Sequence, residues 1–192
     1  MNKERLAAFT DGMFAVVLTV MVLELKAPHG DTLQALASQA PTFLAYVLSF
    51  VYGAIYWNNH HHFFALVHKV NGAILWANLH LLFWLTLIPF TSAWMGEHPT
   101  APWPVAVYGL SLLAAALAWT VLQAVIIGHQ GPQSPLKAAL GRDLKSKVSP
   151  ILYLAGIGSA FLNVWIAEAF YVAVALMWLV PDRRIERKLE GK

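Results

Sequence analysis

Three long stretches of this sequence contain no charged side chain. They lie between Asp31 and Lys69, between Lys69 and Glu97, and between Glu97 and Lys137. Each is long enough for a helix of about 20 residues, the length that crosses the hydrocarbon core of a bilayer. Soluble domains carry about 25% charged residues, whereas here 12% of residues are charged and 58% are hydrophobic. We therefore expect an all-α membrane protein.

The last apolar stretch, residues 148–180, fits a single span poorly. As one helix it would be about 50 Å long, against a hydrocarbon core of about 30 Å. Division near Asn163 gives two short spans and six crossings in all. Charge favours this division, because cytoplasmic segments carry an excess of Lys and Arg. Six crossings leave only Lys26 outside, whereas five would also place the basic tail there.

The expected layout is a domain of six transmembrane helices over residues 1–182, followed by a basic cytoplasmic tail, residues 183–192. The spans are expected at about residues 5–26, 41–62, 72–95, 103–128, 148–162 and 164–181. Both chain ends are expected in the cytoplasm, and the protein in the plasma membrane. The chain has no cysteine, which excludes disulfides and thiol chemistry.

The first span carries an unusual number of polar groups. Such groups cost free energy at membrane depth and mark function or hydrogen bonding between helices. At about 100° per residue, one arc of about 80° on this helix collects small and apolar side chains with a single hydroxyl. The arc consists of Gly12, Val16, Thr19, Val20 and Leu23. Asp11 lies roughly opposite, so its carboxylate needs hydrogen-bond donors from other spans.

Possible donors occur in the next two spans. Indole, imidazole and amide groups gather at residues 57–62, and again at Asn78 and His80. All three groups can donate a hydrogen bond to a carboxylate or a hydroxyl. From the residues alone, an apolar face at helical spacing most often serves packing. A polar network between spans can equally fix the fold or serve transport.

The segment Arg5-Leu6-Ala7-Ala8-Phe9-Thr10-Asp11-Gly12 resembles a known signature. It is similar to the Arg-x-x-x-Phe-Ser-Asp motif that opens the first helix of the transmembrane protein 175 family. These proteins are potassium channels of endosomes and lysosomes, with bacterial relatives. The likeness continues through residues 19–23, 57–61, 75–79 and 87–90. Thr10 stands where the family has serine, and it keeps the hydroxyl.

The resemblance implies that the first helix lines a central pore, and that chains with one six-helix repeat form homotetramers. Matched onto this sequence, the pore constriction is Val16, Val20 and Leu23, and Thr19 is the hydroxyl linked to selectivity. Both valines are smaller than the Ile or Leu expected there, so the seal is either looser or dominated by Leu23. The resemblance also implies an interhelical network of signature residues. Its expected members are Arg5, Phe9, Thr10, Asp11, Trp57, His60 and Asn78.

The expected function is a potassium-permeable cation channel with a modest preference for potassium, and not an enzyme. The chain has no Thr-Val-Gly-Tyr-Gly loop, so selectivity must arise differently from that of common potassium channels. A narrow apolar neck would stop ions by losing its water when closed. Glu24 could enrich cations at the outer mouth, or be a solvated surface acid. The expected partners are further copies of the chain, monovalent cations and the bilayer; neither a cofactor nor nucleic acid is expected.

Three alternatives remain at this level. A proton channel or proton-coupled transporter would use Asp11 and the histidines near membrane depth. A membrane metalloenzyme would use His60, His61 and His62, although three adjacent side chains on a helix point in different directions. A structural scaffold would support no ion flux.

Overall fold

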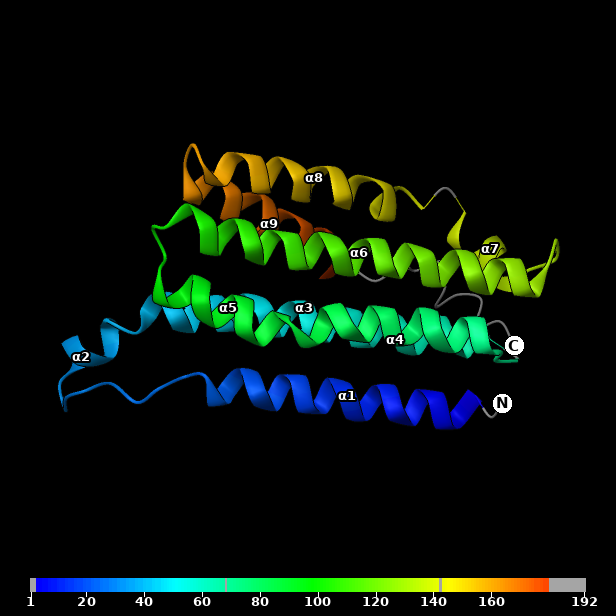
Figure 1. The fold of residues 1–192 in the computed structure, drawn as a ribbon, viewed down its shortest axis with the longest axis horizontal. Coiled ribbons are helices and arrows are strands. Elements are labelled where there is room, and N and C mark those ends of the chain that lie inside the picture. Colours follow the sequence, from blue (N-terminus) through cyan, green and yellow to red (C-terminus); the bar gives the residue numbers. More distant parts are fainter. Residues whose placement is uncertain (1–2, 68, 142, 180–192) are drawn as a thin grey trace.

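The computed structural model describes residues 3–67, 69–141 and 143–179, and within these ranges all regular structure is helical. The long helices run side by side along one axis (Figure 1). The helices are α1 (Lys3–Leu23), α2 (Leu33–Ala37), α3 (Ala40–Ala65), α4 (Gly72–Thr86), α5 (Ile88–Glu97), α6 (Pro102–Gln130), α7 (Pro135–Leu140), α8 (Leu144–Ala160) and α9 (Val164–Leu179). The expected tail, residues 183–192, and the end of the last expected span lie outside the described residues.

Four stretches in the described part of the chain are long and apolar enough to cross a membrane. They are α1, α3, α6 and the combined stretch Gly72–Glu97. Helix α8 is shorter, with 17 residues, and the described part of α9 has 16 residues. Residues 161–163 separate them, and the two helices pack against each other as an antiparallel pair (Figure 1).

Prolines and one asparagine mark where several helices begin. Pro41 and Pro102 lie in the first turns of α3 and α6, where a missing backbone N–H costs no hydrogen bond. Asn71 precedes α4, and its side chain accepts a hydrogen bond from the backbone N–H of Ile74. This contact satisfies one of the free donors at the helix start.

The expected third span, residues 72–95, is interrupted rather than continuous. Helix α4 ends at Thr86 and α5 begins at Ile88, so Leu87 separates two helices. Pro89 explains the break, because proline lacks a backbone N–H and its ring clashes with the carbonyl four residues earlier. The backbone turn is tighter here than in an α-helix, because the Leu87 N–H donates to the Trp84 carbonyl, three residues earlier, at 3.2 Å.

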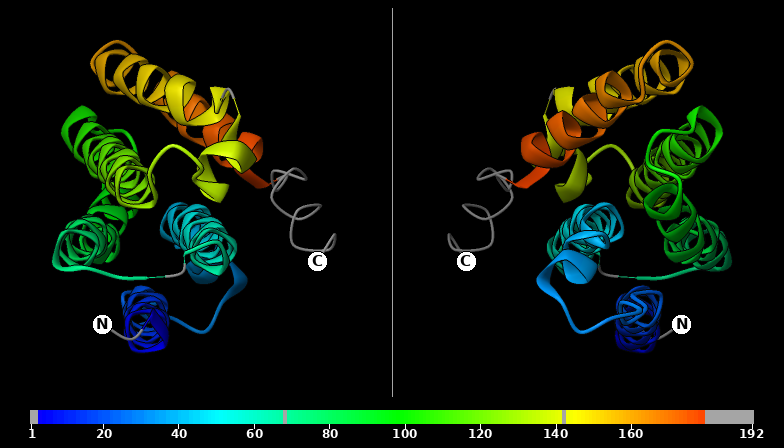
Figure 2. Two further views of the ribbon diagram at one scale, coloured as in Figure 1. Left: turned by 90° about the vertical axis from the view of Figure 1, so that its right-hand side faces the viewer. Right: turned by 90° about the vertical axis from the view of Figure 1, so that its left-hand side faces the viewer.

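The helices form a stack with α1 at one side and the α8–α9 pair at the other (Figure 2). Helix α1 packs mainly against α3, α4 and α5, and α6 packs against α4, α5, α8 and α9. The buried core therefore runs through the middle of the stack, around α3 and α6. Among the largest fully buried side chains are Tyr52, Tyr108, Leu112, Leu122 and Tyr171.

Candidate functional site: the two faces of α1 and its polar contacts

One narrow stripe of α1 faces the rest of the protomer. Its buried members are Leu6, Thr10, Phe14, Val17 and Met21. These residues are three or four apart, so they lie on one side of the helix. Thr10 is the polar member, and its side chain is fully buried.

Asn78 joins Thr10 to His60 by two hydrogen bonds. The Asn78 amide nitrogen donates to Thr10 Oγ1 at 2.9 Å, and His60 Nε2 lies 2.8 Å from Asn78 Oδ1. A carbonyl oxygen only accepts, so His60 must carry its proton on Nε2 in this arrangement. All three residues are buried. This chain of bonds connects α1, α3 and α4 at a point closed to solvent.

Asp11 has a different partner, the indole of Trp57 on α3. Trp57 Nε1 donates to Asp11 Oδ1 at 3.0 Å, and both residues are exposed. The His61 ring lies next to Trp57, with 6.2 Å between ring centroids. The carboxylate is therefore held by one indole donor at the edge of the protomer, apart from the buried Thr10–Asn78–His60 chain.

Arg5 and Phe9 lie outside both groups of contacts. Both side chains are exposed on α1, and Phe9 is 50% exposed. Among the described residues, Arg5 has no hydrogen-bond or ion-pair partner. The structure thus does not bring these two signature residues into the hydrogen-bonded network.

The face expected to form the constriction points away from the rest of the protomer. Val16 is 57% exposed, Val20 is 38% exposed and Leu23 is 73% exposed. Thr19 is also exposed, and its hydroxyl donates to the Ala15 carbonyl at 2.8 Å. A single chain therefore presents these side chains on an open surface, and closes no constriction by itself.

The end of α1 approaches the end of α5 through one ion pair. Lys26 Nζ lies 3.0 Å from Glu97 Oε1, and both side chains are largely exposed. Glu24 is exposed and shares a shallow depression with Val20 and Lys26. The carboxylates of Glu24 and Glu97 therefore share this depression with the Lys26 ammonium group.

The adjacent histidines on α3 do not converge. His60 stacks on Phe64 with 4.2 Å between ring centroids, while His61 is exposed and its ring lies nearly perpendicular to that of His62. Across residues 3–67, 69–141 and 143–179, no three His, Asp or Glu side chains are placed to hold a metal ion. This arrangement offers no support for the metalloenzyme alternative.

A second group of polar contacts, which the motif-based reasoning missed, joins α3, α6, α8 and α9. It is built on four tyrosines, Tyr52, Tyr108, Tyr153 and Tyr171, all of them buried. Tyr108 Oη lies 3.0 Å from Ser49 Oγ, and Tyr52 Oη donates to the Tyr171 carbonyl at 2.6 Å. Buried tyrosine hydroxyls need partners, so tyrosines inside apolar spans were the signal for such a cluster.

Two glycines make room for the side chain of Tyr171. A Cβ atom at Gly109 on α6 would overlap the Tyr171 hydroxyl, and one at Gly156 on α8 would lie 2.5 Å from Tyr171 Cε1. The hydroxyl of Tyr171 donates to the Val105 carbonyl at 3.2 Å. The Tyr171 side chain of α9 is thus fixed between α6 and α8.

Comparisons with known proteins converge on one group. A family model described as "Endosomal/lysosomal potassium channel TMEM175" matches residues 5–89. A potassium channel from Chryseobacterium sp. is 52% identical over 190 residues, which cover 99% of each chain. The crystal structure of a lysosomal potassium-selective channel TMEM175 homolog from Chamaesiphon minutus aligns with a TM-score of 0.82. That alignment has 28% identity and covers 94% of this chain and 97% of the other.

A more distant relative carries a different functional name. The human endosomal/lysosomal proton channel TMEM175 is 33% identical over 86 residues, or 38% of this chain and 17% of that protein. The names of the relatives therefore describe channels, with two different permeating ions.

Proposed function

Because this chain belongs to the family of the endosomal/lysosomal potassium channel TMEM175, we propose that it conducts potassium through a pore lined by α1. In this proposal four copies surround a central axis, and each contributes the open face of its first helix. The observation that carries the proposal is that face, which is apolar, exposed in the protomer and opposite to the contacts that hold α1.

The side chains on this face suit a gate that works by excluding water. Rings of Val16, Val20 and Leu23 offer no hydrogen bonds, so a narrow neck of these residues would empty of water and block ions. Widening the neck would admit hydrated or partly stripped cations. Potassium is less tightly hydrated than sodium, which gives a modest preference for potassium.

Thr19 is suited to sharpen that preference. Its hydroxyl proton is directed to the Ala15 carbonyl, so the oxygen lone pairs remain available. Four such oxygens around an axis would replace part of the water lost by a passing cation. The permeating ion is cargo, and the mechanism requires no cofactor.

The buried bonds to α1 would set the direction of the pore face. The Thr10–Asn78–His60 chain fixes the rotation of α1 against α3 and α4. Rotation by one residue, about 100°, would turn Val16 and Leu23 away from the axis. Glu24 lies one position beyond the helix end, where its carboxylate would attract cations to the mouth.

The test is ion flux into liposomes that contain the purified protein, with potassium, sodium or a bulky organic cation as the gradient ion. We expect Leu23→Ala and Val16→Ala to increase cation leak, and Thr19→Ala to reduce the preference for potassium over sodium. Leu154→Ala is the matched control, because Leu154 is an exposed leucine on α8 at the opposite side of the stack (Figure 2). If none of the three α1 variants differs from this control, α1 does not line the path.

The proposal includes six crossings of a plasma membrane, with both chain ends in the cytoplasm. The absence of cysteine from the sequence makes this testable, because a single introduced thiol is the only reactive site. We expect an impermeant thiol reagent outside the cell to label Gln34→Cys before α3, and not Gln133→Cys between α6 and α7. Equal labelling of both positions would contradict this topology.

Proton conduction is the second candidate, and the name of the human relative favours it. Asp11 is the carboxylate that could relay a proton near α1, and Trp57 donates to it. If protons are the main cargo, Asp11→Asn abolishes acidification of the liposome lumen under a pH gradient. If potassium is the main cargo, Asp11→Asn leaves potassium flux measurable.

A further inference from the structure

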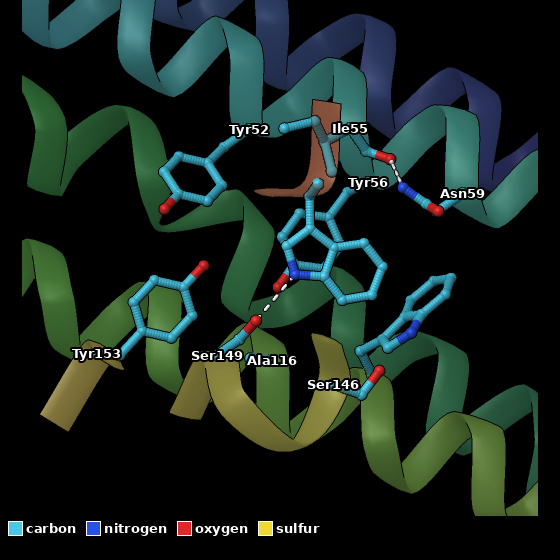
Figure 3. A pocket seen from close by; sticks show the side chains of 10 residues that line it. Tyr52, Ile55, Tyr56, Asn59, Ala116, Ser146, Ser149 and Tyr153 are labelled. Carbon is cyan, nitrogen blue, oxygen red and sulfur yellow. Dashed lines mark hydrogen bonds between the residues drawn. The ribbon is translucent and has the colours of Figure 1, made fainter. Parts of the chain in front are cut away.

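A small cavity lies between α3, α6, α8 and α9. Its walls include Tyr52, Ile55, Tyr56 and Asn59 from α3, and Ser146, Ser149 and Tyr153 from α8 (Figure 3). The space available to the centre of a water-sized sphere is about 30 Å³. A buried water needs about 10–15 Å³ measured in this way, so the cavity can hold one or two.

Two polar atoms on the cavity wall are sealed from solvent and have no hydrogen-bond partner among the described residues. They are the indole nitrogen of Trp119 and the hydroxyl of Ser146. Trp119 is only 6% exposed. Buried polar atoms are almost always hydrogen-bonded to protein or to ordered water, so each of these atoms calls for a partner.

Packing holds the Trp119 indole in place, and the start of α8 holds the backbone of Ser146. The Trp119 ring packs against Tyr56 and Phe63, with ring centroids 6.1 Å and 5.1 Å apart. Ser146 is in the first turn of α8, where its backbone N–H bonds the Asp143 side chain at 3.4 Å. Both groups are therefore held at the wall of the cavity.

Several neighbouring polar groups are already occupied. Trp178 Nε1 donates to Ser149 Oγ at 2.8 Å, and that hydroxyl donates to the Lys145 carbonyl at 2.8 Å. The Asn59 amide nitrogen donates to the Ile55 carbonyl at 2.8 Å (Figure 3). Within the described residues nothing bonds Trp119 Nε1 or Ser146 Oγ, and a water molecule can supply the partner.

We propose that this cavity is a hydration site, in which ordered water accepts from Trp119 Nε1 and hydrogen-bonds Ser146 Oγ. The water links the middle of α6 to the start of α8. Its chemistry fits both groups, because water accepts from an indole N–H and can either donate to or accept from a hydroxyl. This inference is independent of the proposed function.

Other occupants fit the site less well. A cation would meet the positive end of the Trp119 N–H, and no carboxylate is among the lining residues. An anion would have no charged partner there, and burying an unpaired charge is costly.

The thermal test uses Ser146→Ala in the purified, reconstituted protein. If the hydroxyl holds a bound water, its removal lowers the unfolding midpoint, by about 2 °C or more. If the cavity is dry, Ser146→Ala removes an unsatisfied buried group and puts a better helix former in α8, so the midpoint rises or is unchanged. Two tryptophan variants serve as controls for the Trp119→Phe variant described below. Trp103→Phe, at an exposed position, shows the effect of losing an indole, and Trp178→Phe shows the effect of losing a direct hydrogen bond.

A double-mutant cycle with Trp119→Phe removes the ambiguity of lost packing. If one water bridges the two groups, Trp119→Phe costs less in the Ser146→Ala background than in the native chain. Additive losses would overturn the proposal. A high-resolution structure provides an independent test, since the proposal requires density about 2.7–3.2 Å from both atoms. A lipid tail in the cavity, or no density there, would also overturn it.

Discussion

The two sides of the molecule are held together in different ways. Helix α1 contacts its neighbours through one buried stripe and two sets of polar bonds, and the rest of its surface is open. On the far side, α6, α8 and α9 interlock around Tyr171, whose ring fills space left by Gly109 and Gly156. Helix α1 is thus attached mainly by a few directional hydrogen bonds, whereas α6, α8 and α9 are attached by close packing of complementary surfaces.

This difference indicates where substitutions can be tolerated. A helix fixed by hydrogen bonds at one level keeps its orientation while the remainder of its surface is free for other contacts. A helix locked by close packing has no such freedom, because interiors are dense and resist added volume. The family signature lies on the α1 side, within residues 5–89.

The largest expected effect is on the interlocked side. Gly156→Val places methyl groups where the Tyr171 ring lies, and overpacking of this kind costs about 3 kcal/mol. Thermal unfolding of the purified protein measures the loss. Gly158→Val is the matched control, because no side chain lies within 4 Å of a Cβ at Gly158 on the same helix. If the two variants were equally stable, close packing around Tyr171 would not distinguish this side of the molecule from the α1 side.

The next effect concerns the buried bonds of α1. Asn78→Ala leaves Thr10 Oγ1 and His60 Nε2 without their shared partner, at a cost of about 1–2 kcal/mol. Asn58→Ala on α3 is the control, because Asn58 is only half-buried and makes no hydrogen bond within the described residues. A loss as large as that of Gly156→Val would mean that α1 is held as rigidly as α9.

A smaller effect is expected at the edge of the protomer. Trp57→Phe removes the donor to Asp11, and hydrogen bonds between membrane helices are worth about 0.6 kcal/mol on average. Trp76→Phe, at an exposed indole on α4, gives the baseline for losing a tryptophan. Unfolding in detergent compares the two variants. If Trp57→Phe costs more than Asn78→Ala, the exposed bond is the main anchor of α1.

The smallest effect is expected at the Lys26–Glu97 pair. The two side chains are 72% and 52% exposed, and ion pairs of this kind contribute little to stability. We expect Glu97→Gln to leave the unfolding midpoint unchanged at low and high salt. A salt-dependent drop would show that the end of α1 is fixed by charge as well as by the buried bonds.

Sequence patterns were informative where one physical requirement dominates. Charge-free stretches gave the approximate positions of α3 and α6, because burying a charge in lipid is costly. The break at Leu87 was missed although Pro89 is visible, because hydrophobicity continues across it and membrane helices often tolerate proline.

Contacts that depend on helix register were beyond sequence reasoning. The spacing of α1 separates Asp11 from Val16, but it does not say that Trp57, and not a histidine, reaches the carboxylate. In the sequence, nothing distinguishes Gly109 and Gly156 from the other glycines in helices. Their role depends on how α9 lies between α6 and α8, which no local pattern records. The proposed constriction would form only between copies of the chain, so neither the sequence nor a single chain displays it.

The shortness of α8 has a consequence for the surrounding lipid. With 17 residues, α8 is about 26 Å long, several ångströms less than the usual hydrocarbon thickness. In the proposed topology its crossing would produce hydrophobic mismatch, which annular lipids relieve by compressing their acyl chains at some free-energy cost. Short-chain lipids reduce that cost. Acyl-chain length is thereby coupled to the edge of the molecule farthest from α1.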